Sequence, residues 1–475
     1  MEVTWGLCLY PHQTRHHVWN TKDTSPVWLA NRVTEATSAG FSPIHSRDFR
    51  PMQLLDSKDR ILGLDVPLSS GTFALAGKLV VTVATTPGRK SGGVQEDRVL
   101  LFPSLLLDPI APVQDHGGAP AGVGLGFLGD MRDYALFGVC DGTTGDHAAQ
   151  FVQDHFVSIL RMSPAFRGEE GGPSKAREQA NNNDLTREAQ MHRALGETFR
   201  EVDAALARHV VACSTDGDIH PCTGCTAVVA LVYLPTLLVA IAHAGDSEAI
   251  VGSRDSKVTH TGNNDSEHGD RSDPILDNVQ AQSLTPPHLP NNPIEQKRIE
   301  SAGGQVVLHR RNAYRKHSVY HMASSDDYLQ KHGVGRSFAW SRGFGGGYLK
   351  TDFGMSIEPG LCAMRLMREN QLASAVRGSL PDLEDGAATT LCRGQVLILA
   401  SDGLWERITP LETVLVALRS DVMQPTAGEG EGKFSEPTAL SLAERLVQGT
   451  ITRGTKDNVS VITLLVVDDN AKREA

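Results

Sequence analysis

Residues 227–242 form an almost unbroken apolar run, AVVALVYLPTLLVAIA, which the chain must bury in a protein core or a membrane. The run is short for a bilayer-spanning helix, which needs about 20 apolar residues. Leu234-Pro235-Thr236 divides it into two halves rich in β-branched residues, a pattern typical of a buried β-hairpin. We therefore predict a core built on strands and no association with a membrane.

The composition supports one large folded domain and argues against nucleic acid as its partner. The chain has 475 residues, 40% hydrophobic and 21% charged, which is enough apolar material for a packed core. Its net charge of -11 argues against a general nucleic-acid binder. Seven scattered cysteines favour reduced thiols, and residues 1–19 lack the pattern of a secretory signal. We expect an intracellular monomer, cytoplasmic or nuclear.

The pattern along the chain suggests three parts. Residues 1–77 show no clear periodicity and are interpreted as an N-terminal extension of unknown role; residues 78–468 form the main domain, and 469–475 a C-terminal tail. Apolar runs predict strands, and apolar stripes of helical period predict helices. The predicted strands include 79–86, 134–140, 249–253, 394–400 and 459–467, and the predicted helices 147–160, 191–211, 294–302 and 440–447. This mixture indicates an α+β domain with helices outside its sheets.

Acidic residues stand at the ends of several predicted strands. Asp141 follows LFGVC, Asp402 follows VLILAS, Asp457 precedes NVSVITLLVV, and Glu96-Asp97 precedes VLLF. Any one of them alone is more often a turn or cap residue. Carboxylates that gather repel one another unless hard cations such as Mg²⁺ or Mn²⁺ lie between them. Two such ions can share a hydroxide and hold a phosphate for in-line displacement.

The sequences around these acids resemble, in order, the motifs of the metal-dependent serine/threonine protein phosphatases, the type 2C (PPM) family. The resemblance runs from about Lys78 to Val467. The matching segments are QEDR (95–98), FGVCDGTTGDHAA (137–149), GCTAVVALV with AHAGDSEAIV (224–232, 242–251), LTPPHLPNNPIEQKRIESAGGQVV (284–307), FAWSRGFGGGYLK (338–350), LILASDGLWERIT (397–409) and GTKDNVSVITLLV (454–466).

The resemblance implies a central β-sandwich of two antiparallel sheets flanked by helix pairs. It also implies an enzyme that hydrolyses phosphoserine and phosphothreonine in phosphoproteins, by direct attack of a hydroxide that bridges two Mg²⁺ or Mn²⁺ ions. Carried over by position, Asp141 would bridge both ions, and Asp97 would orient water beside them. The remaining ligands implied are Asp402 and Asp457 for one ion, Glu96 and the Gly142 carbonyl for the other, and Asp246 and Glu406 for a weaker third ion.

The chain departs from the family pattern where substrate is handled. Thr143 replaces a histidine often assigned as the general acid, whose help is worth about 10²–10⁴-fold, and Thr144 replaces a glycine. Gly92 stands where a phosphate-binding arginine is expected, so Arg89 or Lys90 would have to bind the phosphate. Gly346 and Pro287 replace aspartates. The alternative prediction is a weak or inactive pseudophosphatase that binds phosphoproteins or acts as a scaffold.

Two further patterns leave alternatives open. Cys222-x-x-Cys225, with Cys213, His209 and His220 nearby, allows a zinc site, although Cys225 also begins an apolar strand. The basic, aromatic segment 310–320 is a solvated face, a nucleic-acid contact or a flap that attracts a phosphopeptide.

Overall fold

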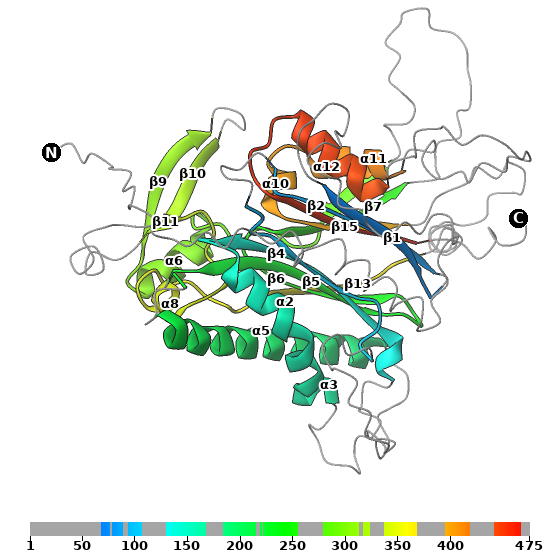
Figure 1. The fold of residues 1–475 in the computed structure, drawn as a ribbon, viewed down its shortest axis with the longest axis horizontal. Coiled ribbons are helices and arrows are strands. Elements are labelled where there is room, and N and C mark those ends of the chain that lie inside the picture. The colour runs from blue at the N-terminus through cyan, green and yellow to red at the C-terminus, as the bar shows by residue number, and fades with distance from the viewer. Residues whose placement is uncertain are drawn as a thin grey trace, which may run out of the picture.

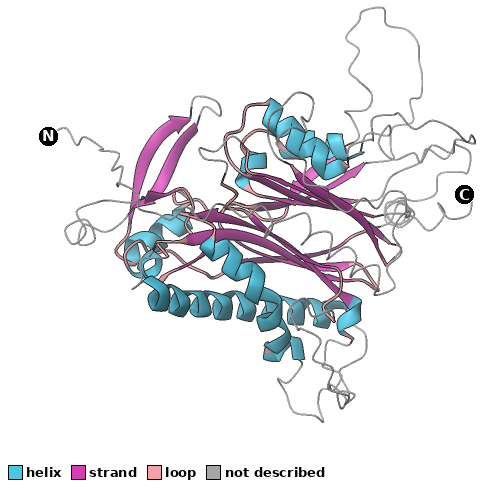
Figure 2. Ribbon diagram, in the orientation of Figure 1, coloured by secondary structure: helices cyan, strands magenta, loops and turns pink. Residues whose placement is uncertain are grey.

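The structure is a computed structural model, and it describes the chain from residue 68 to 466 with gaps. The described ranges are 68–76, 78–88, 94–106, 130–167, 184–214, 219–220, 222–254, 279–312, 317–323, 337–367, 395–418 and 441–466. Two antiparallel sheets stack on each other, and helices cover both outer faces (Figures 1 and 2). The predicted α+β sandwich with flanking helices is confirmed.

The first sheet has the strand order β1-β2-β15-β14-β7-β8, every neighbouring pair antiparallel. Its strands are β1 (Ser69–Leu75), β2 (Leu79–Thr86), β7 (Glu248–Arg254), β8 (Val279–Ser283), β14 (Val396–Ala400) and β15 (Val459–Val466). The edge strand β1 lies before Lys78, where the sequence analysis started the main domain, so the sheet begins earlier than we predicted. Residues 1–67 lie outside the described part of the chain, and the role of the N-terminal extension stays a prediction.

The second sheet has the order β13-β6-β5-β4-β3, and the short strand β12 also pairs with β5. Its strands are β3 (Arg98–Phe102), β4 (Tyr134–Thr143), β5 (Gly224–Tyr233), β6 (Leu238–Ala244), β12 (Phe344–Gly345) and β13 (Gly360–Arg365). The predicted hairpin over residues 227–242 is confirmed as β5 and β6, paired in register from Ala227 and Ala244 to Tyr233 and Leu238.

Burial on both faces explains why these strands are continuously apolar. In β4, Phe137 and Val139 pack between the two sheets, whereas Tyr134, Leu136 and Cys140 face the helices. A strand covered on one side only would alternate with polar residues. The apolar run that we used to exclude a membrane span is therefore the centre of a layered core, and no helix in the described ranges is long and apolar enough to cross a bilayer.

The helices cover the sandwich in two groups (Figure 1). One packs on β4–β6 and comprises α2 (His147–Met162), α3 (Pro164–Arg167) and α5 (Asp184–Ser214). The other packs on the first sheet and comprises α10 (Asp402–Trp405), α11 (Pro410–Leu418) and α12 (Leu442–Thr452). A capping box opens α11, with reciprocal hydrogen bonds between Thr409 and Glu412. Helix α5 begins seven residues before the predicted start, Met191.

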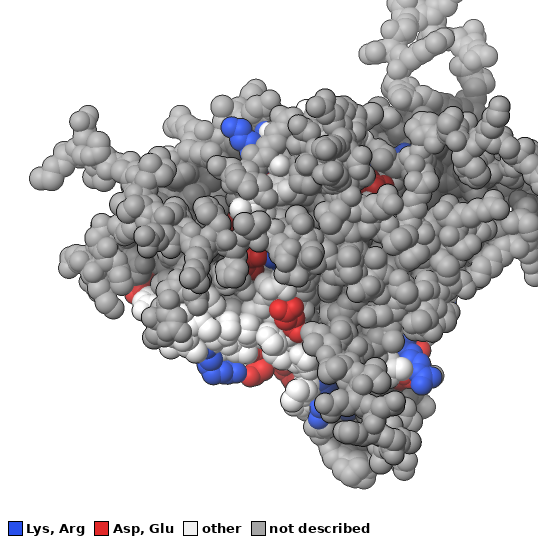
Figure 3. All heavy atoms as spheres, in the orientation of Figure 1, with Lys and Arg blue, Asp and Glu red and all other residues white. Residues whose placement is uncertain are grey.

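A third, smaller unit projects beside the sandwich. It comprises a three-stranded sheet of β9 (Gln305–Asn312), β10 (His317–Ala323) and β11 (Ser337–Phe338), with α6 (Pro293–Ser301) before it and α8 (Gly347–Thr351) after it in the chain. The 3-10 turn η1 (Met131–Asp133) is not part of this unit and directly precedes β4. A separate apolar cluster that includes Ile299, Met322, Trp340 and Phe353 supports its base. On the face in Figure 3, the described acidic and basic side chains stand in small groups rather than one broad patch.

Candidate active site

Two acidic residues lie next to each other at neighbouring strand ends of the second sheet. Strand β3 starts at Arg98, which pairs with Cys140 near the end of the antiparallel strand β4. Asp97 immediately precedes the first strand and Asp141 follows Cys140 in the second, so both stand at the same edge of this sheet. Register therefore brings together residues 44 positions apart, as antiparallel pairing at a strand end requires.

Three acidic residues lie in the same way at neighbouring strand ends of the first sheet. Strand β14 ends at Ala400, β15 begins opposite that end, and β7 begins on its other side. Asp402, Asp457 and Asp246 stand just beyond these three strand ends. Each sheet thus presents its carboxylates at one edge, where the backbone is fixed by the ladder and the side chain reaches beyond it.

The carboxylates at the strand ends of the two sheets lie close together, because the charges of one group change the pKa of the other. The charges of Asp97, Asp402, Asp457 and Asp246 all add to the effect of burial in raising the pKa of Asp141 well above its usual range. Asp141 in turn lies within hydrogen-bonding reach of both Asp97 and Asp402. Five of the predicted site residues, Asp246 among them, therefore gather in one place, as like charges that destabilise each other.

Asp97 is the most deeply buried of these acids, with 2% of its surface exposed. Ser401 Oγ donates to Asp97 Oδ2 at 2.9 Å, whereas Oδ1 has no hydrogen-bond partner of normal geometry among the described residues. Burial raises the pKa of Asp97 to about 6, helped by the charge of Asp457 and opposed by Ser460 and Ser401. A buried carboxylate oxygen without a partner is costly, and a cation would satisfy it.

Glu96 faces the loop that follows Asp141. Gly145 N donates to Glu96 Oε1 at 2.9 Å. The loop passes so close that a Cβ on Gly142 would lie 2.5 Å from the Glu96 carbonyl oxygen, so only glycine fits there. Between these glycines Thr144 has φ 62, a left-handed conformation that is strained for a β-branched residue.

A buried guanidinium holds the backbone behind Glu96. Arg98 Nη1 donates to the carbonyls of Gln95 and Asp97, each at 2.9 Å, and Nε donates to Gln150 Oε1 at 2.6 Å. Its Nη2 pairs with Asp146, the residue before α2, whose side chain makes no cap bond to that helix. Arg98 thereby ties the segment before β3 to the start of the helix after β4.

Asn458 performs the corresponding task for the first sheet. Its Oδ1 accepts from Glu96 N at 2.9 Å, and its Nδ2 donates to the carbonyls of Pro87 and Val94, each at 2.9 Å. Asn458 N also donates to Asp457 Oδ1 at 2.9 Å. One side chain therefore links the edges of both sheets, next to a predicted ligand on each.

Asp246 and Glu406 also come near each other. Burial raises the pKa of Asp246 to about 6, and the charges of Glu406 and Asp457 add to the rise. Glu406 is exposed, and its charge also contributes to the raised pKa of Asp402. The two residues implied for a third ion are thus close to each other and to Asp402.

The donor set fits a hard divalent cation. All its side-chain donors are carboxylate oxygens, which Mg²⁺ and Mn²⁺ prefer, and their mutual repulsion is what a cation relieves. In the ranges that the structure describes, no three acidic, histidine or cysteine side chains already form a ready-made metal cage. The residues that could hold ions are the acids described above: Glu96, Asp97, Asp141, Asp402, Asp457, Asp246 and Glu406.

Other predicted positions have different outcomes. Arg89, Lys90 and Gly92 lie outside the described residues, so phosphate binding by Arg89 or Lys90 stays a prediction. Gly346 is the N-cap of α8, a structural position in which glycine is accepted. The zinc alternative gains no support, because Cys222 and Cys225 are buried in two separate apolar clusters.

The sequence analysis missed the polar side chains that hold these acids. Ser401, Arg98 and Asn458 adjoin Asp402, Asp97 and Asp457 in sequence, and this adjacency was a usable signal. An arginine opening the apolar strand RVLLF was a second signal, since a buried guanidinium needs several acceptors.

Comparison with known proteins identifies the family pattern independently of these contacts. A family model described as Protein phosphatase 2C matches residues 124–459. Protein phosphatase 2C 77 of Arabidopsis thaliana is 26% identical over 346 residues, covering 69% of this chain and 59% of that protein. Protein phosphatase 2C 1 of Paramecium tetraurelia is 31% identical over 184 residues, covering 37% of this chain and 45% of that protein. The chain thus spans about half the length of these relatives.

A solved structure has the same fold. The serine-threonine phosphatase 2C from Toxoplasma gondii superposes with a TM-score of 0.54 at 22% sequence identity, covering 84% of this chain and 99% of that one. At this identity the likeness concerns the architecture.

Proposed function

The chain belongs to the protein phosphatase 2C family, and we propose that it is a metal-dependent phosphatase acting on phosphoserine and phosphothreonine in proteins. The observation that carries the proposal is the gathering of Asp97, Asp141, Asp402 and Asp457 from the ends of two sheets. A purely structural role gives no reason for keeping several like charges together in a desolvated place.

The residues have separable tasks in this proposal. Asp141, within hydrogen-bonding reach of both Asp97 and Asp402, and Glu96, whose Oε1 accepts from Gly145 N, would both serve as ligands of the ions. Mg²⁺ or Mn²⁺ supplies Lewis acidity and lowers the pKa of bound water. Asp97, held by Ser401, would accept a proton from water beside it.

The test is hydrolysis of a phosphothreonine peptide in Mn²⁺ by the unaltered protein, Asp141→Ala and Asp402→Asn. We expect both variants to lose about 10³-fold or more in kcat/KM, since metal ions supply several kcal/mol of transition-state stabilisation. Glu412→Gln is the control, because this carboxylate forms an ion pair with Arg453 near the protein surface. Equal activity in all four proteins would remove the proposal.

A second candidate function is a phosphoprotein-binding pseudophosphatase, and Thr143 favours it. This half-buried residue ends β4 directly after the Asp141-Gly142 pair, where the family has its general acid, and a threonine hydroxyl is a poor proton donor at neutral pH. Tight binding of a phosphopeptide with no turnover in Mg²⁺ or Mn²⁺ would support this function over the first.

A further inference from the structure

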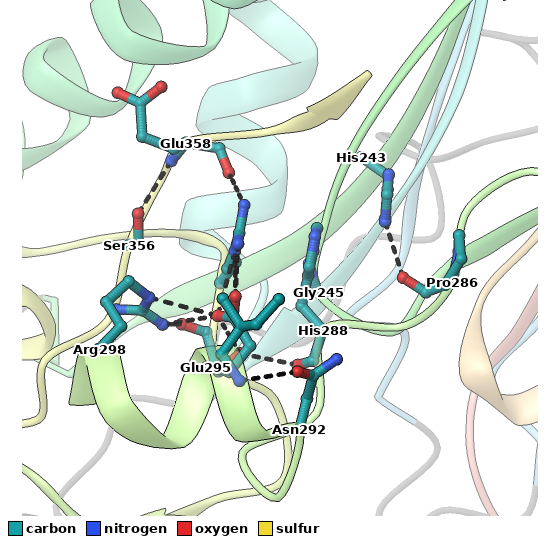
Figure 4. Close-up of polar contacts among 12 residues, drawn as sticks. His243, Gly245, Pro286, His288, Asn292, Glu295, Arg298, Ser356 and Glu358 are labelled. Carbon is teal, nitrogen blue, oxygen red and sulfur yellow. Dashed lines mark hydrogen bonds and ion pairs between the residues drawn. The ribbon is translucent and has the colours of Figure 1, made fainter. Parts of the chain in front are cut away.

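A polar network surrounds Gly245, the residue before Asp246 (Figure 4). Gly245 N donates to His288 Nδ1 at 3.3 Å, and His288 N donates to the Gly245 carbonyl at 2.9 Å. His288 thus contacts both polar groups of one glycine backbone. Gly245 has φ 111, and a Cβ there would lie 2.4 Å from Thr226 Cβ, so the turn leaves little room to move.

The His288 ring is held in a fixed plane. It stacks on His243 with ring centroids 4.3 Å apart and planes 6° apart. His243 Nε2 lies 3.0 Å from the Pro286 carbonyl and Nδ1 lies 3.3 Å from the Gly360 carbonyl. These two contacts hold the His243 ring, on which His288 stacks. Burial, with the nearby His243 and Arg342, lowers the pKa of His288 to about 3, so its neutral ring can accept the Gly245 hydrogen bond.

An ion cluster in turn holds the backbone of His288. Ser341 N donates to the His288 carbonyl at 2.9 Å, and Ser341 Oγ lies 2.8 Å from Glu295 Oε2. Arg342 and Arg298 both bind the Glu295 carboxylate, in part through Arg342 Nε at 3.0 Å and Arg298 Nη2 at 2.8 Å (Figure 4). A path of direct contacts therefore runs from helix α6 to the turn that carries Asp246.

We propose that His288 is a positioning residue for Asp246, which sets the direction of this carboxylate by clasping Gly245. The proposal rests on the metal-dependent function proposed above. Residues that orient a ligand typically change metal affinity 10–100-fold when removed. The buried contact between Thr226 Oγ1 and Ser247 Oγ, 2.7 Å, fixes the other side of the turn, so the clasp completes a support on both sides of Asp246.

Two variants separate the hydrogen bond from the ring stack. His288→Phe keeps a ring to stack on His243 but offers Gly245 N no acceptor, whereas His288→Asn offers an amide oxygen near the Nδ1 position but no ring. Asp246→Asn removes one ligand charge and serves as the reference. Mn²⁺ binding to each purified full-length protein is measured by the electron paramagnetic resonance signal of free Mn²⁺, and exchange of the Gly245 amide by hydrogen–deuterium exchange.

We expect the weakest class of Mn²⁺ sites to lose about 10-fold or more in affinity in His288→Phe and in Asp246→Asn, and at most about 2-fold in His288→Asn. The tighter class should stay unchanged in all three, and Gly245 exchange should quicken in His288→Phe alone. Unchanged binding in His288→Phe, equal loss in both His288 variants, or weakening of every class overturns the positioning role. If the unaltered protein binds no Mn²⁺, the proposed function itself fails, and the inference with it.

Discussion

Two groups of carboxylates in this molecule differ in how their charge is balanced. At the ends of the sheets, burial raises the pKa of Asp97, Asp141 and Asp402, and the charges of neighbouring acids, Asp457 in each case, add to the rise. In α6, burial alone would raise the pKa of Glu295, but hydrogen bonds from Arg342, Arg298 and Ser341 lower it to about 2. Among the described residues, two arginines offset the charge of Glu295, whereas the charges that act most strongly on the strand-end acids are those of other carboxylates.

The difference separates a structural carboxylate from those of the proposed metal site. Breaking a buried pair leaves an uncompensated charge and is strongly destabilising. Removing one charge from a group of like charges relieves repulsion instead. Removing the charge of Glu295 should therefore lower the stability of the protein, whereas removing a strand-end charge should raise it. Activity should fall mainly when a strand-end acid is changed.

Glu295→Ala should destabilise the protein by about 3–5 kcal/mol, because it leaves two partly buried arginines without their carboxylate. Urea unfolding at pH 7 measures it, with Glu412→Ala as the matched control. Glu412 also pairs with an arginine and its pKa is also lowered to about 2, but its side chain is 42% exposed, so we expect less than about 1 kcal/mol. Equal losses would show that burial does not distinguish the two pairs.

The sign of the pH dependence follows from the lowered pKa of Glu295. Its contribution is fully present above the pKa of about 4.5 that the residue has when unfolded, and it is lost as pH falls toward about 2. In Glu295→Gln this component of acid destabilisation should disappear.

Thr143→His should raise kcat by about 10²-fold if the rest of the site is competent, because it restores a proton donor beside Asp141. Initial rates with a phosphothreonine peptide, measured across pH 6–8, give the result. Thr143→Asn is the control for polarity and size. A histidine variant no faster than the asparagine variant would mean that protonation of the leaving group does not limit the rate.

Asp141→Asn should stabilise the metal-free protein at pH 7, in contrast to any change at Glu295. We expect roughly 1 kcal/mol or more, since each unit of a raised carboxyl pKa corresponds to about 1.4 kcal/mol. Thermal unfolding in the presence of a chelator measures the change. A lower melting temperature for this variant would mean that Asp141 has a stabilising partner within the protein, and the contrast with Glu295 would fail.

Thr144→Gly should stabilise by about 1 kcal/mol, because glycine adopts φ 62 without the steric penalty of a β-branched side chain. Thr143→Gly is the matched control on the neighbouring residue, which ends β4 and should be destabilised instead. Chemical denaturation of both variants decides it. Destabilisation of equal size at both positions would show that the loop carries no strain at Thr144.

The parts of this account that were legible in the sequence have a common physical origin. Strands such as β5 and β6 are buried on both faces, so they appear as continuous apolar runs. The acids adjoin such runs, and antiparallel pairing then brings them to one edge. The support of Asp246 was not legible, because residues 245, 288, 295 and 341 meet only through long-range contacts. Strand β1 was missed because SSGTFAL is only partly apolar.

Dependence of turnover on a divalent ion tests the central claim most directly. The full-length protein is stripped of metal, assayed on a phosphothreonine peptide, and assayed again after Mn²⁺ or Mg²⁺ is added, alongside Asp141→Ala. The strand-end acids predict no turnover without the ion, recovery when it is added, and no recovery in Asp141→Ala. Turnover that persists in excess chelator and is indifferent to the Asp141 substitution would contradict the account.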